Sequence, residues 1–88
     1  MAYSVEFTER AARVRDSLPH ERRAVLERGL AILVTEPRHK LSHAVGGDES
    51  TREIALSRSL VVEYVISDGK LVVLLVTVID LTDVLIEE

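Results

Sequence analysis

The C-terminal half of the chain contains the stretch that decides the fold, TREIALSRSLVVEYVISDGKLVVLLVTVI, residues 51–79. It divides into three runs, 51–57, 60–67 and 71–79, which are rich in the β-branched and aliphatic residues that favour strands. Between the last two runs, Ser67-Asp68-Gly69-Lys70 is typical of a hairpin turn. The stretch therefore predicts three consecutive antiparallel strands, of which the last is a central strand covered on both faces.

The first of these strands alternates, so its side chains divide between the two faces of the sheet. Arg52, Ile54 and Leu56 are expected on one side, and Glu53 and Ala55 on the other.

The N-terminal half predicts one strand and two helices. Residues 3–7 alternate with a period of two, as in a short strand. Thr8 is then placed to cap a helix that runs to about Ser17. Pro19 breaks the chain and starts a second helix that ends near Thr35, because proline is tolerated in a first helical turn.

Two features adjoin this second helix. Gly29 in its interior is disfavoured by about 1 kcal/mol relative to Ala, which indicates close packing of the helix against the sheet. Residues 37–50 contain Pro37 and Gly46-Gly47 and are expected to form a loop. The predicted order is β-α-α-β-β-β, an α+β fold in which a helical hairpin packs on one face of an antiparallel sheet.

Length and composition limit the classes of function. The 88 residues are expected to form one domain, with an acidic C-terminal segment at 80–88. Cysteine is absent, which excludes thiolate metal sites and thiol nucleophiles. No leader peptide is evident, and the longest apolar run falls short of the roughly 20 residues that span a bilayer. We therefore expect a cytoplasmic protein with no membrane partner and no cofactor.

Charge is distributed unevenly along the chain. The formal net charge is −4, and residues 41–88 hold three basic and nine acidic side chains. Because most nucleic-acid binders neutralise phosphates with a basic face, this half argues against such a partner. The acidic C-terminal segment with its apolar residues is compatible with a homodimer or a complex.

Several short segments occur in the order and spacing of one known family. They are Phe7-Thr8-Glu9-Arg10-Ala11, Pro37-Arg38, Arg52-x-Ile54-x-Leu56, Tyr64 before Asp68-Gly69-Lys70, and the valine-rich strand 72–78. Over residues 1 to about 80 the chain resembles the RelE/ParE toxin superfamily of bacterial type II toxin–antitoxin systems, and within it the RelE branch.

The resemblance implies a toxin that cleaves messenger RNA in the ribosomal A site, an endoribonuclease without a metal, and an antitoxin partner that blocks it. Such chemistry needs cations beside the phosphate. Arg52 matches the first cation of the family, whereas the second falls at Ile54 and the Arg of the next strand at Val61. Because losing one stabilising group commonly costs 10²–10³ in rate, these replacements favour a degraded catalytic set and an apolar sheet face.

Four residues are candidates for the chemistry: Arg52, Arg58, Glu63 and His43. Arg52 and Arg58 would contact phosphate, and Glu63 or His43 would move a proton. Each has a structural alternative: Arg52 as an edge cation paired with Glu53 or Glu63 or solvated, and Glu63 as a solvated strand carboxylate.

The loop carries the second set of candidates, Arg38, His39 and Lys40. The resemblance implies that this basic loop grips RNA, and the alternative is a solvated loop. His39 and His43 have i, i+4 spacing, but no third ligand is evident and the glycine-rich loop is not helical, so no metal site is expected.

Three other functions remain open. The fold could serve as a protein-binding or dimerisation module without nuclease activity, or it could be recruited to a small-molecule reaction. It could also inhibit gyrase, as the ParE-like branch does.

Overall fold

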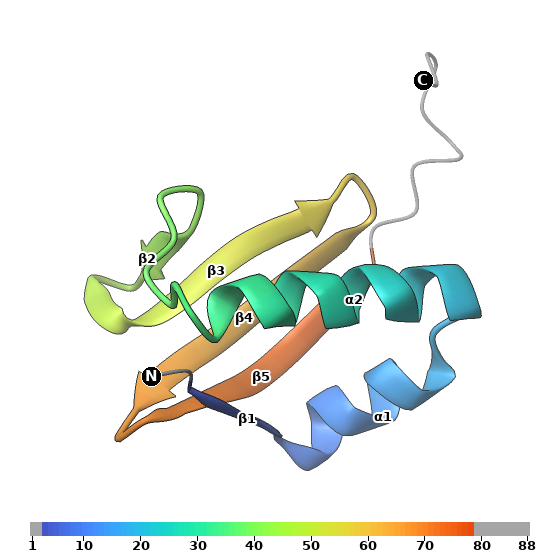
Figure 1. The fold of residues 1–88 in the computed structure, drawn as a ribbon, viewed down its shortest axis with the longest axis horizontal. Coiled ribbons are helices and arrows are strands. Elements are labelled where there is room, and N and C mark those ends of the chain that lie inside the picture. Colours follow the sequence, from blue (N-terminus) through green and yellow to red (C-terminus); the bar gives the residue numbers. More distant parts are fainter. Residues whose placement is uncertain (1–2, 79–88) are drawn as a thin grey trace.

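The computed structural model describes residues 3–78 of the chain, so the predicted acidic segment 80–88 lies outside the described part. Seven elements follow in order: β1 (Ser4–Phe7), α1 (Glu9–Ser17), α2 (His20–Leu33), β2 (His43–Val45), β3 (Asp48–Ser57), β4 (Leu60–Ser67) and β5 (Lys70–Val78). Both helices lie on the same face of the sheet (Figure 1). The predicted α+β class and the helical hairpin on one face are confirmed.

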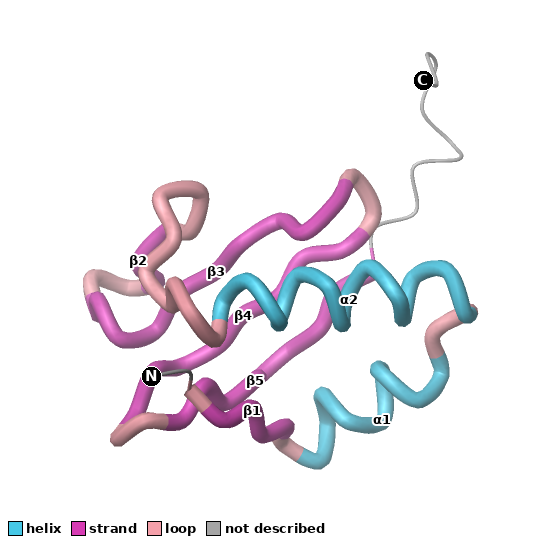
Figure 2. The backbone as a smooth tube through the Cα atoms, in the orientation of Figure 1, coloured by secondary structure: helices cyan, strands magenta, loops and turns pink. Residues whose placement is uncertain are grey.

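The sheet differs from the prediction in its number of strands and in one pairing. Its order is β1-β5-β4-β3-β2, so the first and last strands of the predicted pattern are neighbours. They are parallel, with Val5 opposite Leu71 and Phe7 opposite Val73. The other three pairings are antiparallel, so the sheet is mixed. Figure 2 shows the five strands side by side.

The fifth strand, β2, arises inside the segment 37–50 that was expected to be a loop. Gly46 and Gly47 have φ angles of +61° and +80°, which two-residue hairpin turns require. The turn sets Val45 opposite Asp48, so β3 starts at Asp48 rather than at residue 51. The prediction was wrong here because it took Gly46-Gly47 as part of a loop. A Gly-Gly pair between two short strand segments is itself a hairpin signal.

The helices begin and end as predicted, within two residues. Thr8 caps α1, because its Oγ1 accepts a hydrogen bond from the backbone N–H of Ala11 at 3.2 Å. The same hydroxyl donates to the carbonyl oxygen of Leu74 at 3.1 Å, which connects the start of α1 to β5. Pro19 is the N-cap of α2.

The core lies between the helices and one face of the sheet. Its buried residues are Ala11 and Leu18 in and after α1, Leu26, Leu30 and Leu33 in α2, and Ile54, Leu60, Val62, Tyr64, Ile66, Leu71, Val73 and Val76 in the sheet. Close packing at Gly29 is confirmed, since a Cβ atom there would lie 2.6 Å from Cδ2 of Leu56. The opposite face of the sheet is free of helices among the described residues.

Candidate functional site

Arg52 lies on the helix-covered side of β3 and is only 8% exposed. Its Nε donates to Ser42 Oγ at 2.8 Å and its Nη2 to the carbonyl oxygen of Ser42 at 3.2 Å. Its Nη1 donates to Oε1 of Glu49 at 2.8 Å and to the carbonyl oxygen of Glu49 at 3.2 Å. The structural alternatives for Arg52, a pair with Glu53 or Glu63 or a solvated side chain, are wrong, because alternation along β3 turns Arg52 toward the core side and those carboxylates away from it.

Tyr64 stands directly opposite Arg52 on β4 and is fully buried. Its hydroxyl donates to the carbonyl oxygen of Pro37. The two side chains thus hold the segment between α2 and β3 at two points, Pro37 and Ser42. Their polar groups satisfy backbone groups that no helix or strand pairs, which is what buried polar side chains require.

The basic loop residues lie within this anchored segment. Nδ1 of His39 accepts a hydrogen bond from the backbone N–H of Leu41 at 3.1 Å, and the His39 carbonyl accepts from Ser42 Oγ at 2.6 Å. Arg38 and Lys40 are exposed, and Leu41 is 61% exposed. The loop therefore presents its basic and apolar side chains from a backbone held by Ser42.

His43 and Glu63 belong to one row of residues across the uncovered face of the sheet. His43 of β2 stands opposite Glu53 of β3, Glu53 opposite Glu63 of β4, and Glu63 opposite Leu75 of β5. Residues directly opposite share a face, so all four side chains lie on the side away from the helices. The row brings together two of the predicted site residues, with Glu53 between them.

Aliphatic side chains surround the two carboxylates. Val61 and Val65 flank Glu63 on β4, and they stand opposite Ala55 and Thr51 of β3 respectively. On the other side, Val65 pairs with Val72 of β5. The valines are partly exposed. The expected apolar face is present at Val61, whereas Ile54, the other expected replacement, is buried on the helix-covered side. The charge around Glu53 and Glu63 is acidic rather than cationic.

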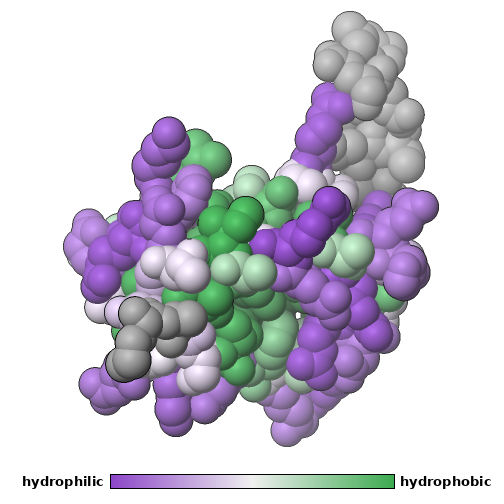
Figure 3. Space-filling view, viewed as in Figure 1, coloured by the Kyte–Doolittle hydropathy of each residue, from purple (hydrophilic) through white to green (hydrophobic). Residues whose placement is uncertain are grey.

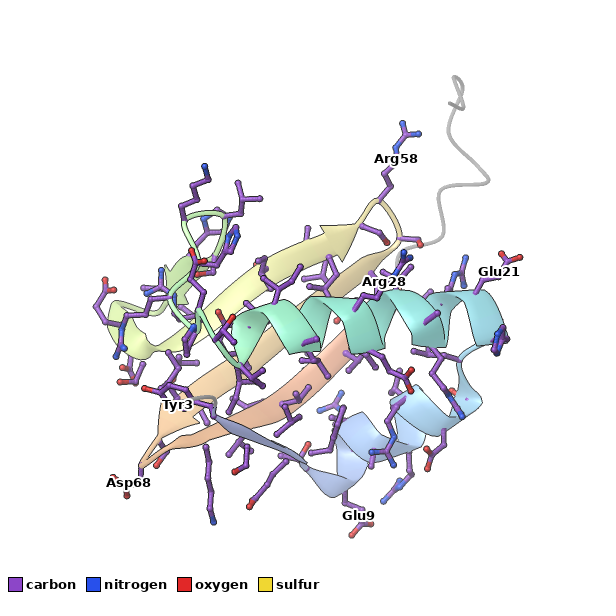
Figure 4. The ribbon with its side chains drawn as sticks, viewed as in Figure 1. Tyr3, Glu9, Glu21, Arg28, Arg58 and Asp68 are labelled. Atoms are coloured by element: carbon purple, nitrogen blue, oxygen red, sulfur yellow. The ribbon has the colours of Figure 1, made fainter. Side chains whose placement is uncertain are left out.

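Arg58 lies apart from this row, in the turn between β3 and β4. Its side chain extends from the end of the sheet opposite Asp68 (Figure 4). It is exposed, and it interacts with other residues. The predicted site residues therefore occupy four places: the buried side of β3, the uncovered face, the exposed loop 38–40 and the exposed turn at Arg58.

Metal ligands do not gather in the described part of the chain. Between residues 3 and 78, no group of three or more His, Asp or Glu side chains is placed to hold an ion. Within the same range, no helix is long and apolar enough to cross a membrane.

A groove of about 400 Å³ opens on the helix side of the molecule. It lies between β1, α1 and α2, and it is lined by Val5, Phe7, Arg15, Leu26, Glu27, Leu30, Ala31 and Val34. Figure 3 shows apolar residues in the middle of this face with hydrophilic ones around them.

Two charged groups stand among the apolar lining of the groove, Arg15 and Glu27. The Arg15 guanidinium lies 4.6 Å from the centre of the Phe7 ring, in a cation–π arrangement. It also donates to Oδ1 of Asp16 at 2.9 Å, and this hydrogen bond lowers the pKa of Asp16. The groove can therefore accept an apolar surface and offers it one cation and one anion.

Sequence reasoning missed Ser42 and Glu49 as partners of Arg52, and Glu53 as the neighbour of Glu63. A tight turn at residues 58–59 would by itself set Ile54 opposite Glu63. The register shift between Ala55 and Ser57 moves Glu53 into that place, and the strand prediction did not contain this shift. The groove has no sequence signal of its own, because it depends on how far the two helices diverge.

The fold matches solved structures over most of the chain, although no protein-family model and no curated protein matches the sequence. The isolated RelE toxin of E. coli is 23% identical with a TM-score of 0.78, and the match covers 94% of this chain and 90% of that chain. The RelBE2 toxin–antitoxin complex of Mycobacterium tuberculosis contains a chain that is 26% identical, with a TM-score of 0.72 and coverage of 89% and 99%.

A third match is the E. coli DinJ–YafQ toxin–antitoxin complex, at 15% identity and a TM-score of 0.66, with coverage of 89% and 93%. These matches include the helical hairpin and the sheet together, since each covers about nine tenths of both chains. The chain has the RelE-like toxin fold.

Proposed function

We propose that this chain is the toxin of a type II toxin–antitoxin pair and that a cognate antitoxin protein holds it inactive. The observation that carries the proposal is the match to RelE alone and to two toxin–antitoxin complexes over about nine tenths of both chains. Both proteins of the pair are expected in the cytoplasm.

Within residues 3–78, the groove between β1, α1 and α2 suits the antitoxin. Leu26 and Leu30 supply a continuous apolar floor, and the exposed Ala31 leaves room above it. An amphipathic helix placed in such a groove buries its apolar stripe. Opposite charges on that helix would complement Arg15 and Glu27 at the rim.

Induced expression in bacteria tests both parts. We expect the chain alone to arrest growth, and co-expression of the protein encoded by the adjacent gene to restore it. Ala31→Arg fills the groove and is expected to arrest growth without being rescued. Ile32→Arg is the matched control, because Ile32 is 54% exposed on the same helix and does not line the groove. Normal growth with the unmodified chain would contradict the toxin proposal, and equal rescue of both variants would contradict the groove.

The action on the cell has two candidates. Cleavage of messenger RNA on the ribosome is the activity that the RelE resemblance implies, with Arg58 and the loop Arg38–Lys40 as contacts to RNA. Binding of a protein target without cleavage is favoured by the uncovered face, where Glu53 and Glu63 would repel phosphate and Arg52 is turned away toward Ser42. A gyrase target belongs to this second candidate.

Primer extension on messenger RNA during growth arrest separates the two candidates. Cuts within codons, absent in Arg58→Ala and present in the control Arg10→Ala, would support cleavage. Growth arrest with intact messenger RNA would support protein binding, and an assay of DNA supercoiling then identifies or excludes gyrase.

A further inference from the structure

The uncovered face of the sheet contains a like-charge pair at its centre. Glu53 and Glu63 stand directly opposite each other on β3 and β4, and these strands lie inside the sheet, with β2 and β5 on either side. Opposite residues on one face have Cβ atoms about 4.5–5.5 Å apart, and like charges at that separation destabilise the pairing. The chain therefore carries an unfavourable interaction at the middle of an accessible surface.

Neighbouring cations in the described part of the chain are engaged elsewhere. Arg52, next to Glu53 in sequence, points to the other face and bonds to Ser42 and Glu49. Lys70, at a corner of the sheet, pairs with Glu6 at 3.2 Å. No Lys or Arg in residues 3–78 is paired with either carboxylate, and the neighbouring basic side chain on this face is His43 of β2, which stands opposite Glu53.

The surroundings of the pair are aliphatic. Val61 and Val65 lie on either side of Glu63, and Leu75 and Val72 continue the apolar surface on β5. All four are partly exposed rather than buried. A partner that covers this area would remove apolar surface from water and, at the same time, place a group next to the two carboxylates.

We propose that this face binds a protein segment in which a single Lys or Arg is flanked by aliphatic residues, with the cation between Glu53 and Glu63. The negative charge of Glu53 and Glu63 makes RNA a poorer ligand than a cationic segment, because its phosphates would meet two carboxylates. A guanidinium or ammonium group instead relieves their repulsion, and the flanking aliphatic residues pack against Val61, Val65 and Leu75.

The position of the pair also limits how the segment binds. Because β3 and β4 already pair on both edges, the segment cannot add to the sheet as a strand there and contacts side chains only. This inference rests on the second candidate action, binding without cleavage. It does not depend on growth arrest, and it is tested on the purified full-length chain.

The test is a titration of the ¹⁵N-labelled chain with two synthetic peptides that have the same aliphatic residues and either a central Arg or a central Glu. We expect the Arg peptide to shift the amide signals around Glu53 and Glu63 and to bind at least tenfold more tightly than the Glu peptide. Glu53→Gln with Glu63→Gln should weaken binding of the Arg peptide at least tenfold. The matched control is Glu9→Gln with Glu21→Gln, which removes the same charge from the helix side (Figure 4) and should leave binding unchanged.

Three results would overturn the proposal. The first is equal weakening in the control, which would indicate attraction by net charge alone. The second is the absence of shifted signals around Glu53 and Glu63 with the Arg peptide at millimolar concentration, whether or not signals of the helices shift. The third is a single-stranded RNA oligonucleotide that shifts the same signals around Glu53 and Glu63. Because the readout is binding to a purified protein, none of these results bears on whether expression arrests growth.

Discussion

The two faces of the sheet treat charge in opposite ways. On the helix-covered face, Arg52 is buried and each of its three guanidinium nitrogens donates to Ser42 or Glu49. On the uncovered face, one residue along, Glu53 stands opposite another carboxylate. Arg52, the cation of β3 that the family resemblance singled out, therefore stabilises the fold. In the middle of β3 and β4, the charges on the uncovered face are the carboxylates of Glu53 and Glu63.

Removal of Arg52 should have the largest effect on stability. Arg52→Ala leaves the buried Ser42 hydroxyl and carbonyl without their donor, so the free energy of unfolding should fall by about 3 kcal/mol. The exposed Glu49 contributes little to that figure, because surface ion pairs are weak. Urea unfolding measures the change. Arg13→Ala, at an exposed pair with Glu9, is the control and should cost less than about 1 kcal/mol. A loss as small as the control's would show that Arg52 does not hold the loop.

Substitutions at Val62 and Val61 compare the two faces of the sheet with the same residue type. Val62 is fully buried under the helices and Val61 is partly exposed on the other side. Val62→Ala should lower the free energy of unfolding by about 2.5 kcal/mol through lost burial and a cavity, and Val61→Ala by less than about 1 kcal/mol. Chemical denaturation of both variants measures this difference. Similar losses would mean that the uncovered face is covered by another part of the protein.

Gly29 tests the contact between α2 and the covered face. Leu is a far better helix former than Gly, yet Gly29→Leu should destabilise the protein by about 2 kcal/mol because the new side chain displaces Leu56. Arg28→Leu, on the exposed side of the same helix, should leave the melting temperature nearly unchanged. Stabilisation by Gly29→Leu would refute close packing at this position.

Tyr64→Phe removes the second anchor of the loop while keeping the ring. The buried carbonyl of Pro37 loses its donor, and the expected cost is about 1 kcal/mol. Tyr3→Phe serves as the control, since Tyr3 is only partly buried. In a double-mutant cycle, Arg52 and Tyr64 should couple, because both hold the same segment. If the losses of stability in the two single variants add up to the loss in the double variant, Arg52 and Tyr64 stabilise the protein independently.

The smallest effect is expected from the carboxylate pair, and it has the opposite sign. Glu63→Gln should raise the free energy of unfolding by a few tenths of a kcal/mol, because it removes repulsion from Glu53. Glu53→Gln should do the same, and the double variant should gain no more than either alone. The gain should shrink in 1 M salt, where exposed charges are screened. Additive gains would mean that the two carboxylates do not interact.

Local signals in the sequence predicted most of the fold. Alternation in 51–57, the Asp68-Gly69 turn and the Thr8 cap each depend on neighbours in the chain, and the structure confirms all three. The parallel pairing of β1 with β5 could not be read this way, because it joins residues more than sixty positions apart. The β2 strand was predictable in principle from Gly46-Gly47.

The candidate site was harder to predict than the fold. The family pattern predicted that Arg52 contacts phosphate. Alternation along the strand places Arg52 on the same face as Ile54 and Leu56, but it does not say whether the helices cover that face. That face is known only once Ile54 and Leu56 are seen to pack under α2. The role of Ser42 as acceptor depends on where the loop returns, which no spacing in the sequence reveals.

The adjacent residues Arg52 and Glu53 also make misaligned pairing of β3 costly. A shift of one position against β4 would turn Arg52 to water and bring the Glu53 carboxylate beneath the helices. Burial of an unpaired carboxylate has a large free-energy cost. Two neighbouring charges of opposite sign thereby help the chain to choose a single alignment of its sheet before any partner is present.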